Sequence, residues 1–423
     1  MPAIEYVSYA DATGYGQAAA GYVRLLFEAG YDVHWAPYLN EAIWSGRVGP
    51  VHAAREFAAG RAAMRMRGQA GRVNDLRALI DATARPLQAD VRILHLMPQH
   101  WPAQLSSAAG VPHLGMTVWE TESIPSAWLQ SLGSVRHVAL PSSHNLRVFE
   151  ATRGLGATLP AASLVPHVCK GELRSPPPAR LEALTTWAGI EPGDTVFYTI
   201  NAWDPRKRMA QLVDGFARTF SRRDPAVLLV KTVRAALFDD PAGPPGTRDV
   251  ATIVKTIVAR AASEAGREPG RIALLAEDEM PDNLIDGIHA IGHCFVSLSR
   301  CEGFGLGGFD AASFGRPVIA VGYGGPTDYL GDDWPGRIPH RMVPCESVAG
   351  YPWFDPSQSW PEPDDRAAFA LMREFAAKPQ PFLAAAESIR RKIVSQFGSR
   401  AVSAQLSAAI AAARQASAAP GRA

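Results

Sequence analysis

The chain has 423 residues, 47% of them hydrophobic and 20% charged, with a formal net charge of +1. This length predicts two or three domains, and the apolar fraction excludes wholesale disorder. The balanced charge argues against a protein that binds nucleic acid through an overall basic surface. The four cysteines form no Cys-x-x-Cys pair, so we expect neither a disulfide scaffold nor a thiolate zinc site.

The first residues contain no basic region and become polar by Asp11, so we expect no signal peptide. No run of roughly 18 or more apolar residues occurs, which predicts no transmembrane helix. The expected location is therefore the cytoplasm. Arginines are concentrated between Arg55 and Arg77, where only Glu56 and Asp75 are acidic. This segment could contact anionic lipid at the inner membrane face, but a solvated helix is the favoured interpretation.

Short apolar runs alternate with segments of helical period, a pattern typical of an α/β protein with parallel sheets. In the first half, strands are predicted over residues 4–9, 32–36, 91–96, 111–118 and 135–140. Helices are predicted over residues 17–29, 124–132 and 142–153. Residues 171–180 contain three consecutive prolines, which disfavour helix and predict a stiff connection between two domains.

The same alternation then restarts. Strands are predicted over residues 195–200, 226–230, 271–275, 293–298 and 317–321. Helices are predicted over residues 206–222, 250–264, 281–291 and 306–314. The first of these helices has one apolar stripe, formed by Met209, Leu212, Val213, Phe216 and Phe220. Ligands of open parallel sheets bind beyond the carboxyl ends of the strands, so the loops that follow the strands are expected to form the site.

A glycine-rich loop connects a predicted strand to a short helix within residues 297–329. Its glycines are Gly303, Gly305, Gly307 and Gly308. They let the backbone approach a ligand and leave amides open at a helix N-terminus, a geometry that binds phosphate. Glu302 precedes the loop and Asp310 lies in the helix, where their carboxylates could accept hydrogen bonds from sugar hydroxyls. The alternative is an ordinary turn with two solvated acids.

This block resembles the donor-binding element of retaining glycosyltransferase family 4, whose members have the GT-B fold. The family pattern is Glu, a GFGLP-like stretch and a second acid; here Asp310 replaces the usual Glu and Gly307 the usual proline. The resemblance implies that Glu302 contacts the donor sugar and that Asp310 contacts the ribose. It also implies a donor-binding loop, formed by Gly303, Phe304, Gly305 and Leu306. Residues 322–329 (GYGGPTDY) resemble the Gly-Gly turn that follows.

Residues 199–207 (TINAWDPRK) place Arg206 and Lys207 at the start of a predicted helix. Cations at a helix N-terminus oppose its dipole, and an oxyanion ligand such as a diphosphate would resolve that conflict. The alternative is a basic helix start that faces solvent. By resemblance, Lys207 matches the family's diphosphate-binding Lys. Ala202 occupies the position of its usual Arg, which leaves that contact open to Arg206.

Two N-terminal loops complete the candidate site. In residues 11–18 (DATGYGQA), Gly14 and Gly16 form either an ordinary turn or, by resemblance, a loop that faces the donor phosphate and the acceptor. Residues 117–128 follow a strand, where many family members carry a His near the reacting sugar. This chain has Glu120 in that region, which is either a catalytic substitute or a surface capping acid. Residues 359–372 resemble the family's Trp-x-x-Pro-Asp element.

The resemblance implies a GT-B architecture of two Rossmann-like domains that face each other across a cleft. The expected parts are an acceptor-side domain (1–170), a Pro-rich link (171–194), a donor domain (195–380) and a helical segment (381–423) that packs back on the first domain. Its end, from Ala418, is expected to be mobile. The predicted base and sugar selectivity lies around residues 276–283.

The predicted activity is transfer of a sugar from a nucleotide diphosphate sugar to an acceptor hydroxyl, with Glu302, Glu120 and Lys207 as catalytic candidates. The acceptor could be a glycan, a lipid-linked sugar or a small molecule. The histidines have no metal-ligand spacing, and no cofactor is expected. The alternatives are a GT-B phosphorylase or epimerase-type enzyme, and a sugar-binding protein of degenerate GT-B fold without turnover.

Overall fold

The computed structural model describes residues 1–9, 13–38, 83, 86–108, 110–171, 173, 176–278, 282–347 and 353–416. The basic segment 55–77 and the tail from Ala418 lie outside the described residues, as do parts of the predicted loops 11–18 and 276–283. Backbone contacts divide the chain into two units. The first unit comprises Met1–Trp119, Ser123–Cys169 and Ser395–Ala423, and the second comprises Glu120–Glu122 and Lys170–Val394.

The first unit is built on a six-stranded sheet with the order β2-β1-β3-β4-β5-β6, in which every neighbouring pair is parallel. Its strands are β1 (Ala3–Ser8), β2 (Asp32–Pro37), β3 (Val91–His95), β4 (His113–Met116), β5 (His137–Leu140) and β6 (Ala161–Leu164). Its helices are α1 (Gly14–Glu28), η1 (Pro98–His100), α5 (Trp101–Ser106), η2 (Ser126–Trp128), α6 (Leu129–Leu132), α7 (Ser143–Gly154) and α16 (Ser399–Gln415).

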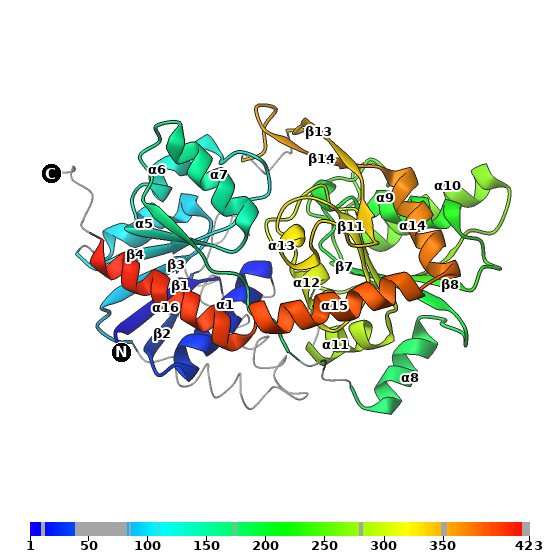
Figure 1. Cartoon of the computed structure of the whole chain (residues 1–423). Coiled ribbons are helices and arrows are strands. Elements are labelled where there is room, and N and C mark those ends of the chain that lie inside the picture. Colours follow the sequence, from blue (N-terminus) through cyan, green and yellow to red (C-terminus); the bar gives the residue numbers. More distant parts are fainter. Residues whose placement is uncertain are drawn as a thin grey trace. The chain divides into compact units, whose positions relative to one another are not determined.

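Helix α16, drawn in red in Figure 1, supplies part of the core of the first unit although it comes last in the chain. One face of the helix is buried, formed by Val402, Leu406, Ala409, Ile410 and Ala413. This spacing of three and four residues gives a single apolar stripe. The stripe packs against β4 and β5, so this sheet is covered by a helix that is distant in sequence.

The second unit contains another six-stranded parallel sheet, with the order β12-β11-β10-β7-β8-β9. Its strands are β7 (Thr195–Ile200), β8 (Ala226–Thr232), β9 (Arg271–Ala276), β10 (Cys294–Ser297), β11 (Val318–Val321) and β12 (Arg337–Ile338). A separate antiparallel hairpin joins β13 (His340–Pro344) and β14 (Ser359–Pro363). The helices are α8 (Pro178–Trp187), η3 (Pro205–Lys207), α9 (Met209–Thr219), α10 (Val250–Ala265), α11 (Asp282–Ile291), α12 (Leu306–Ser313), α13 (Pro326–Leu330), α14 (Asp365–Ala377) and α15 (Gln380–Gln396).

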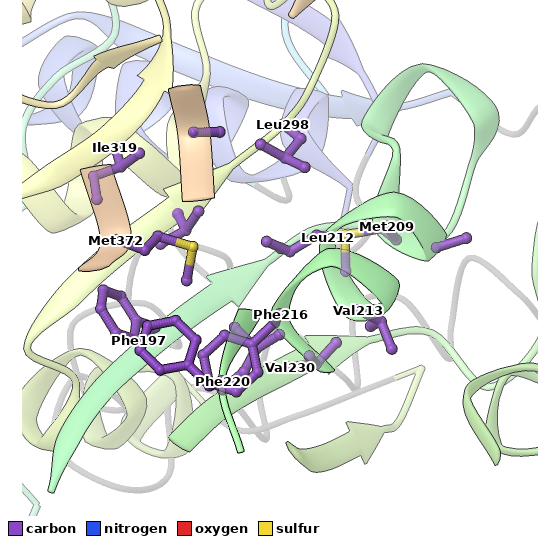
Figure 2. Packing of buried hydrophobic residues seen from close by; sticks show 14 of the residues in the cluster. Phe197, Met209, Leu212, Val213, Phe216, Phe220, Val230, Leu298, Ile319 and Met372 are labelled. Atoms are coloured by element: carbon purple, nitrogen blue, oxygen red, sulfur yellow. The ribbon is translucent and has the colours of Figure 1, made fainter. Parts of the chain in front are cut away.

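Aromatic side chains form much of the core beneath α9. Figure 2 shows Phe197 of β7 packed with Phe216 and Phe220, and Met372 of α14 nearby. The rings of Phe216 and Phe220 are stacked with centroids 4.6 Å apart. The apolar stripe predicted for this region is confirmed, because its five side chains are all buried. This packing anchors the segment that precedes α9, which carries Arg206 and Lys207.

Two predicted elements differ from the structure. The helix predicted over residues 206–222 is shorter: α9 begins only at Met209 and ends at Thr219. The proline-rich link contains α8, which starts at Pro178, the third of the three consecutive prolines. Proline fixes φ near helical values and lacks only an N–H that the first turn does not use, so it is compatible with a helix start.

The α/β class with two parallel sheets is confirmed. None of the described helices is both long and apolar enough to cross a membrane.

Gly115 on β4 leads to a testable prediction about packing in the first unit. A Cβ atom at this position would lie 2.3 Å from Cη2 of Trp101, and Trp101 is fully buried. We expect Gly115→Ala to lower the free energy of unfolding by about 1–3 kcal/mol, because the core has no room for the added methyl group. Chemical denaturation followed by tryptophan fluorescence would measure this loss.

The matched control is Gly154→Ala in the last turn of α7, where a Cβ atom would meet nothing within 4 Å. This substitution should be neutral or slightly stabilising. Equal stability of the two variants would contradict the packing described for Trp101.

Candidate functional site

The candidate site lies where two neighbouring strands of the second sheet end. Strands β7 and β10 are parallel neighbours, so their carboxyl ends meet at the same edge of the sheet. The chain after β7 carries Arg206 and Lys207, and the chain after β10 carries Glu302. A Cβ atom at Gly307 would lie only 3.0 Å from the carbonyl oxygen of Ile200 at the end of β7. The start of α12, which follows the loop after β10, therefore packs directly on the end of β7.

The basic pair sits in the short 3-10 helix η3, not at the start of α9. Asp204 caps η3, since its side chain accepts a hydrogen bond of 3.1 Å from the backbone N–H of Lys207. Arg208 then adopts a left-handed conformation with φ 51° and ψ 40°. It is the only non-glycine residue with positive φ among those the structure describes. This break separates Arg206 and Lys207 from the helix, so the predicted conflict with its dipole does not arise.

The left-handed conformation of Arg208 is compensated by charge pairing. A left-handed backbone conformation costs a residue other than glycine about 1–2 kcal/mol, because its Cβ atom crowds the backbone. The Arg208 guanidinium donates to both carboxylate oxygens of Asp365, at 2.6 and 2.9 Å, and lies 3.1 Å from Glu362. These partners follow or belong to β14, so the turn after β7 is tied to a distant part of the second unit.

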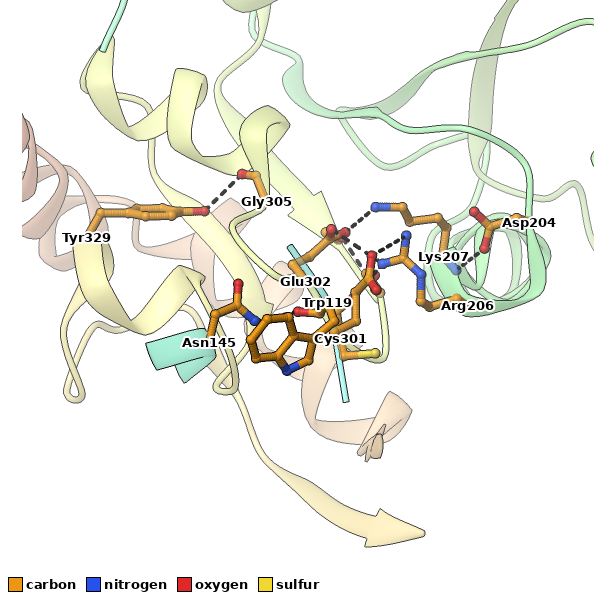
Figure 3. A network of polar contacts seen from close by, with 12 residues as sticks. Trp119, Asn145, Asp204, Arg206, Lys207, Cys301, Glu302, Gly305 and Tyr329 are labelled. Carbon is orange, nitrogen blue, oxygen red and sulfur yellow. Dashed lines mark hydrogen bonds and ion pairs between the residues drawn. The ribbon is translucent and has the colours of Figure 1, made fainter. Parts of the chain in front are cut away.

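Arg206 and Lys207 converge on Glu302, as Figure 3 shows. The Lys207 Nζ lies 2.5 Å from Glu302 Oε1. The Arg206 Nη1 donates to the carbonyl oxygen of Cys301 at 2.5 Å and lies 3.5 Å from Glu302 Oε2. The two basic side chains are 13% exposed and that of Glu302 is 16% exposed. Charged groups this well shielded interact strongly and are tolerated only in pairs.

Glu120 is a second carboxylate of this cluster. The segment Glu120–Glu122 groups with the second unit, and Glu120 Oε1 lies 3.6 Å from Arg206 Nη2. Its side chain is 20% exposed, so most of its surface is shielded from solvent. We name Glu120, Arg206, Lys207 and Glu302 the ion cluster; it contains two cations and two carboxylates.

The pKa values of the two carboxylates in the ion cluster are shifted in opposite directions. Burial raises the pKa of Glu120, and the opposing effect of Arg206 does not cancel this rise. Burial also acts to raise the pKa of Glu302, but Lys207 and Arg206 outweigh it and the net pKa is lowered. Two carboxyl groups whose pKa values are pushed apart are typical of sites that assign them different tasks.

The glycine loop presents backbone groups next to Glu302. Gly305 adopts φ +83° immediately before α12, and its carbonyl oxygen accepts a 3.0 Å hydrogen bond from the Tyr329 hydroxyl. Gly325 packs so closely that a Cβ atom there would lie 2.3 Å from the carbonyl oxygen of Gly303. Both turns therefore require glycine. The amides at the start of α12 are suited to bind an anion together with the nearby cations.

Asp310 lies outside the ion cluster. It is buried in α12 and its carboxylate pairs with the ammonium group of Lys170, the first residue of the long segment of the second unit. The structure thus separates the two acids that the sequence pattern linked: Glu302 faces Arg206 and Lys207, and Asp310 faces Lys170.

Gly14 and Gly16 belong to the first unit and lie in the first turn of α1. Thr13 caps this helix, and its side chain accepts a hydrogen bond from the N–H of Gly16. They are therefore helical residues next to the predicted loop, not its tip. Among the described residues, no group of three His, Cys, Asp or Glu side chains is arranged to hold a metal ion.

Several residues of the site were not predicted. Lys170 carries no motif, and its role as partner of Asp310 depends on folding alone. Arg300 donates its backbone N–H to the carbonyl oxygen of Arg206 at 2.9 Å, and its guanidinium pairs with Glu362 at 2.7 Å. Gln358 contacts Thr121. Its only sequence signal was its position just before the recognised segment 359–372.

Comparison with known proteins identifies the fold. No protein-family model matches the chain, and no curated protein sequence matches it. Solved structures do match over nearly the whole chain. HepE from Anabaena, in complex with UDP and glucose, is 14% identical with a TM-score of 0.62, and the match covers 97% of this chain and 100% of HepE.

Two further structures agree with HepE. Sucrose-phosphate synthase from Thermosynechococcus elongatus is 15% identical with a TM-score of 0.60, covering 96% of this chain and 98% of that one. A glycosyltransferase from Rickettsia africae is 12% identical with a TM-score of 0.60, covering 98% and 99%. The chain has the GT-B fold, as predicted. At these identities the likeness establishes the fold alone.

The positive φ of Arg208 predicts that glycine is tolerated better than alanine at this position, although alanine is usually the more stable replacement. Replacement by Ala removes the pairs with Asp365 and Glu362 and keeps a side chain at positive φ. Replacement by Gly removes the same pairs but relieves the backbone. We therefore expect the free energy of unfolding of Arg208→Gly to be about 1 kcal/mol higher than that of Arg208→Ala. Denaturation in urea would measure this difference. If the Ala variant is the more stable, the left-handed conformation is not a constraint on this turn.

Proposed function

We propose that this chain is a glycosyltransferase that moves a sugar from a nucleoside diphosphate sugar to an acceptor hydroxyl, with retention of the anomeric configuration. The observation that carries the proposal is the convergence of Arg206 and Lys207 on Glu302, directly before the glycine loop and α12. HepE, which shares the fold, was solved with UDP and glucose and with UDP-glucose, and this supports a nucleotide sugar as the donor. Retention rests on the resemblance of the loop to glycosyltransferase family 4.

The first task of such a site is to stabilise the leaving group. Cleavage of the bond between the anomeric carbon and the diphosphate leaves negative charge on the diphosphate and positive character on the sugar. In the proposed reaction, Arg206, Lys207 and the amides of Gly303–Leu306 stabilise the diphosphate. Groups placed in advance where charge develops usually supply the largest part of catalysis. These groups take the role that a divalent metal ion has elsewhere, so the proposal includes no cofactor.

The two carboxylates act on the sugar. Glu302 accepts hydrogen bonds from its hydroxyls, and the charged form of Glu120 stabilises the positive character that develops on the ring. The acceptor oxygen bonds to the anomeric carbon on the face that the diphosphate leaves, and its proton passes to the departing diphosphate oxygen. Asp310 accepts hydrogen bonds from the ribose once Lys170 is displaced.

The function is tested with a panel of nucleotide sugars, by following release of the nucleoside diphosphate with and without candidate acceptors. Sugar acceptors, lipid-linked sugars and small hydroxylated molecules would form the acceptor panel. Release that requires an acceptor hydroxyl supports transfer. Turnover with inorganic phosphate or water alone would indicate a phosphorylase or epimerase-type reaction, and binding without turnover would indicate a sugar-binding protein.

Lys207→Ala should weaken binding of the nucleoside diphosphate more than it perturbs folding. The side chain lies outside the apolar core, and Arg206 remains as a cationic partner of Glu302. A charge-assisted contact accounts for roughly tenfold to a hundredfold in affinity. Titration calorimetry would measure the dissociation constant. Lys255→Ala, which removes an exposed lysine of α10, controls for the loss of one positive charge. Unchanged affinity in Lys207→Ala would contradict the phosphate assignment.

Glu302→Gln should separate sugar contacts from nucleotide contacts. The substitution keeps the size of the side chain but removes its charge, so we expect transfer to fall by more than roughly tenfold. Binding of the free nucleoside diphosphate, which carries no sugar, should not weaken, because the neutral amide no longer competes for Arg206 and Lys207.

The comparison variant is Asp310→Asn, which should weaken binding of the nucleoside diphosphate itself because Asp310 is assigned to the ribose. Identical profiles of turnover and affinity in the two variants would show that the division of roles between the two acids is wrong.

A further inference from the structure

Glu120 is followed in the chain by two residues that contact Gln358 and Ser359, at the start of β14. The side-chain amide Nε2 of Gln358 donates to Thr121 Oγ1 at 3.0 Å. The backbone N–H of Ser359 donates to the Glu122 carboxylate, with both oxygens at 2.7 Å. Thr121 is 1% exposed and Gln358 is 3% exposed. The first contact is therefore shielded from water and geometrically defined.

Gln358 is itself firmly held. Its Oε1 accepts a hydrogen bond from the N–H of Asp355 at 3.2 Å, and its backbone carbonyl accepts one from Cys345 at 2.8 Å. The next residue, Ser359, pairs with Pro344 at the end of the β13–β14 ladder. Trp360 is fully buried in a small apolar cluster with Cys301 and Cys345. A side chain with this many fixed neighbours can orient the group it contacts.

The same hairpin also reaches the backbone of Arg206. Arg300 pairs with Glu362 of β14 at 2.7 Å, and its guanidinium lies 4.8 Å from the ring centroid of Trp360. The backbone N–H of Arg300 donates to the carbonyl oxygen of Arg206 at 2.9 Å. Both members of the Glu120–Arg206 pair are thus tied, through short contacts, to β14.

We propose that Gln358 is a positioning residue for the reaction, which holds Glu120 against Arg206 through its hydrogen bond to Thr121. The inference rests on the proposed function, because it assigns Glu120 a task in sugar transfer. Four charged side chains face Glu120: Arg206, Glu302, Lys207 and Asp204. Small changes in the position of Glu120 therefore change both its contact with Arg206 and its protonation.

The test uses the full-length protein and two variants of the contact. Thr121→Val keeps the size of the side chain and removes the acceptor Oγ1, whereas Gln358→Met removes the donor. Thr121→Ser keeps the hydroxyl and is the conservative rescue. Ser357→Ala, which removes an exposed hydroxyl that contacts Asp355 in the same turn, is the matched control. Glu120→Gln serves as the reference for loss of the carboxylate.

The first readout needs no turnover: the pKa of Glu120, followed by ¹³C NMR of glutamate carboxyl groups and assigned with Glu120→Gln. Because burial is the larger influence and raises this pKa, release of the segment should lower it toward the ordinary carboxyl value in Thr121→Val and Gln358→Met. Thr121→Ser and Ser357→Ala should titrate like the unchanged protein.

The second readout is transfer. The charged form of Glu120 is the active one in the proposed reaction, so transfer declines as the pH falls through its pKa, and the acidic limb should move to lower pH in both contact variants. Their kcat above this limb should fall about three- to tenfold, the range of one hydrogen bond, with unchanged affinity for UDP. The double variant should lose no more than Gln358→Met alone, because that variant already lacks the contact with Thr121.

The inference is overturned if the pKa of Glu120 is the same in the unchanged protein, Thr121→Val and Gln358→Met. It is also overturned if Glu120→Gln lowers transfer while both contact variants keep full kcat; the proposed function then stands. If the pKa shifts as expected but Glu120→Gln transfers at the full rate, Gln358 positions Glu120 as inferred, and the role proposed for Glu120 in transfer is wrong.

Discussion

The ion cluster constrains the structure of the second unit around it. Its two cations and two carboxylates neutralise one another beyond the ends of β7 and β10. Moving a charged group out of water costs several kcal/mol, and only a well-placed counter-charge offsets this. Each member of the ion cluster is shielded to within 13–20% exposure. None can therefore shift alone, and the turn after β7, the loop after β10 and the Glu120 segment must be held in register with one another.

This balance also determines how an anion can bind. The charges of Arg206 and Lys207 are already compensated by Glu120 and Glu302, so the site has no net positive charge to offer. A diphosphate would have to replace carboxylate oxygens of Glu120 and Glu302 as the partner of the two cations. The open amides at the start of α12 supply additional donors that carry no counter-charge. Glu302, once released from Lys207, becomes available to hydroxyl groups of the sugar.

The parts of the site that follow from strand ends could be predicted from the sequence. Buried parallel strands are continuous apolar runs, and the polar residues after them, Lys207 and Glu302, must meet at one edge. Gly305 and Gly325 were likewise recognisable, because the turns they form exclude side chains.

What could not be predicted depends on contacts between distant parts of the chain. Arginine has no preference for positive φ, and Arg208 adopts it because Asp365 and Glu362 hold the guanidinium. Helix α9 therefore begins at Met209, three residues after the predicted start at Arg206. Asp310 pairs with Lys170 for the same kind of reason. The contact of Gln358 with Thr121 joins residues 237 positions apart, and no local pattern encodes such a pair.

The membership of α16 in the core of the first unit bears on synthesis at the ribosome. Domains usually fold as they emerge, beginning with the N-terminal one. Here the buried face of α16, including Leu406 and Ile410, completes a core whose sheet is made first. The part of the sheet that α16 covers stays exposed until the whole of the second unit has been translated. The second unit, which is almost continuous in sequence, can fold in the meantime, so the order of completion is the reverse of the order of synthesis.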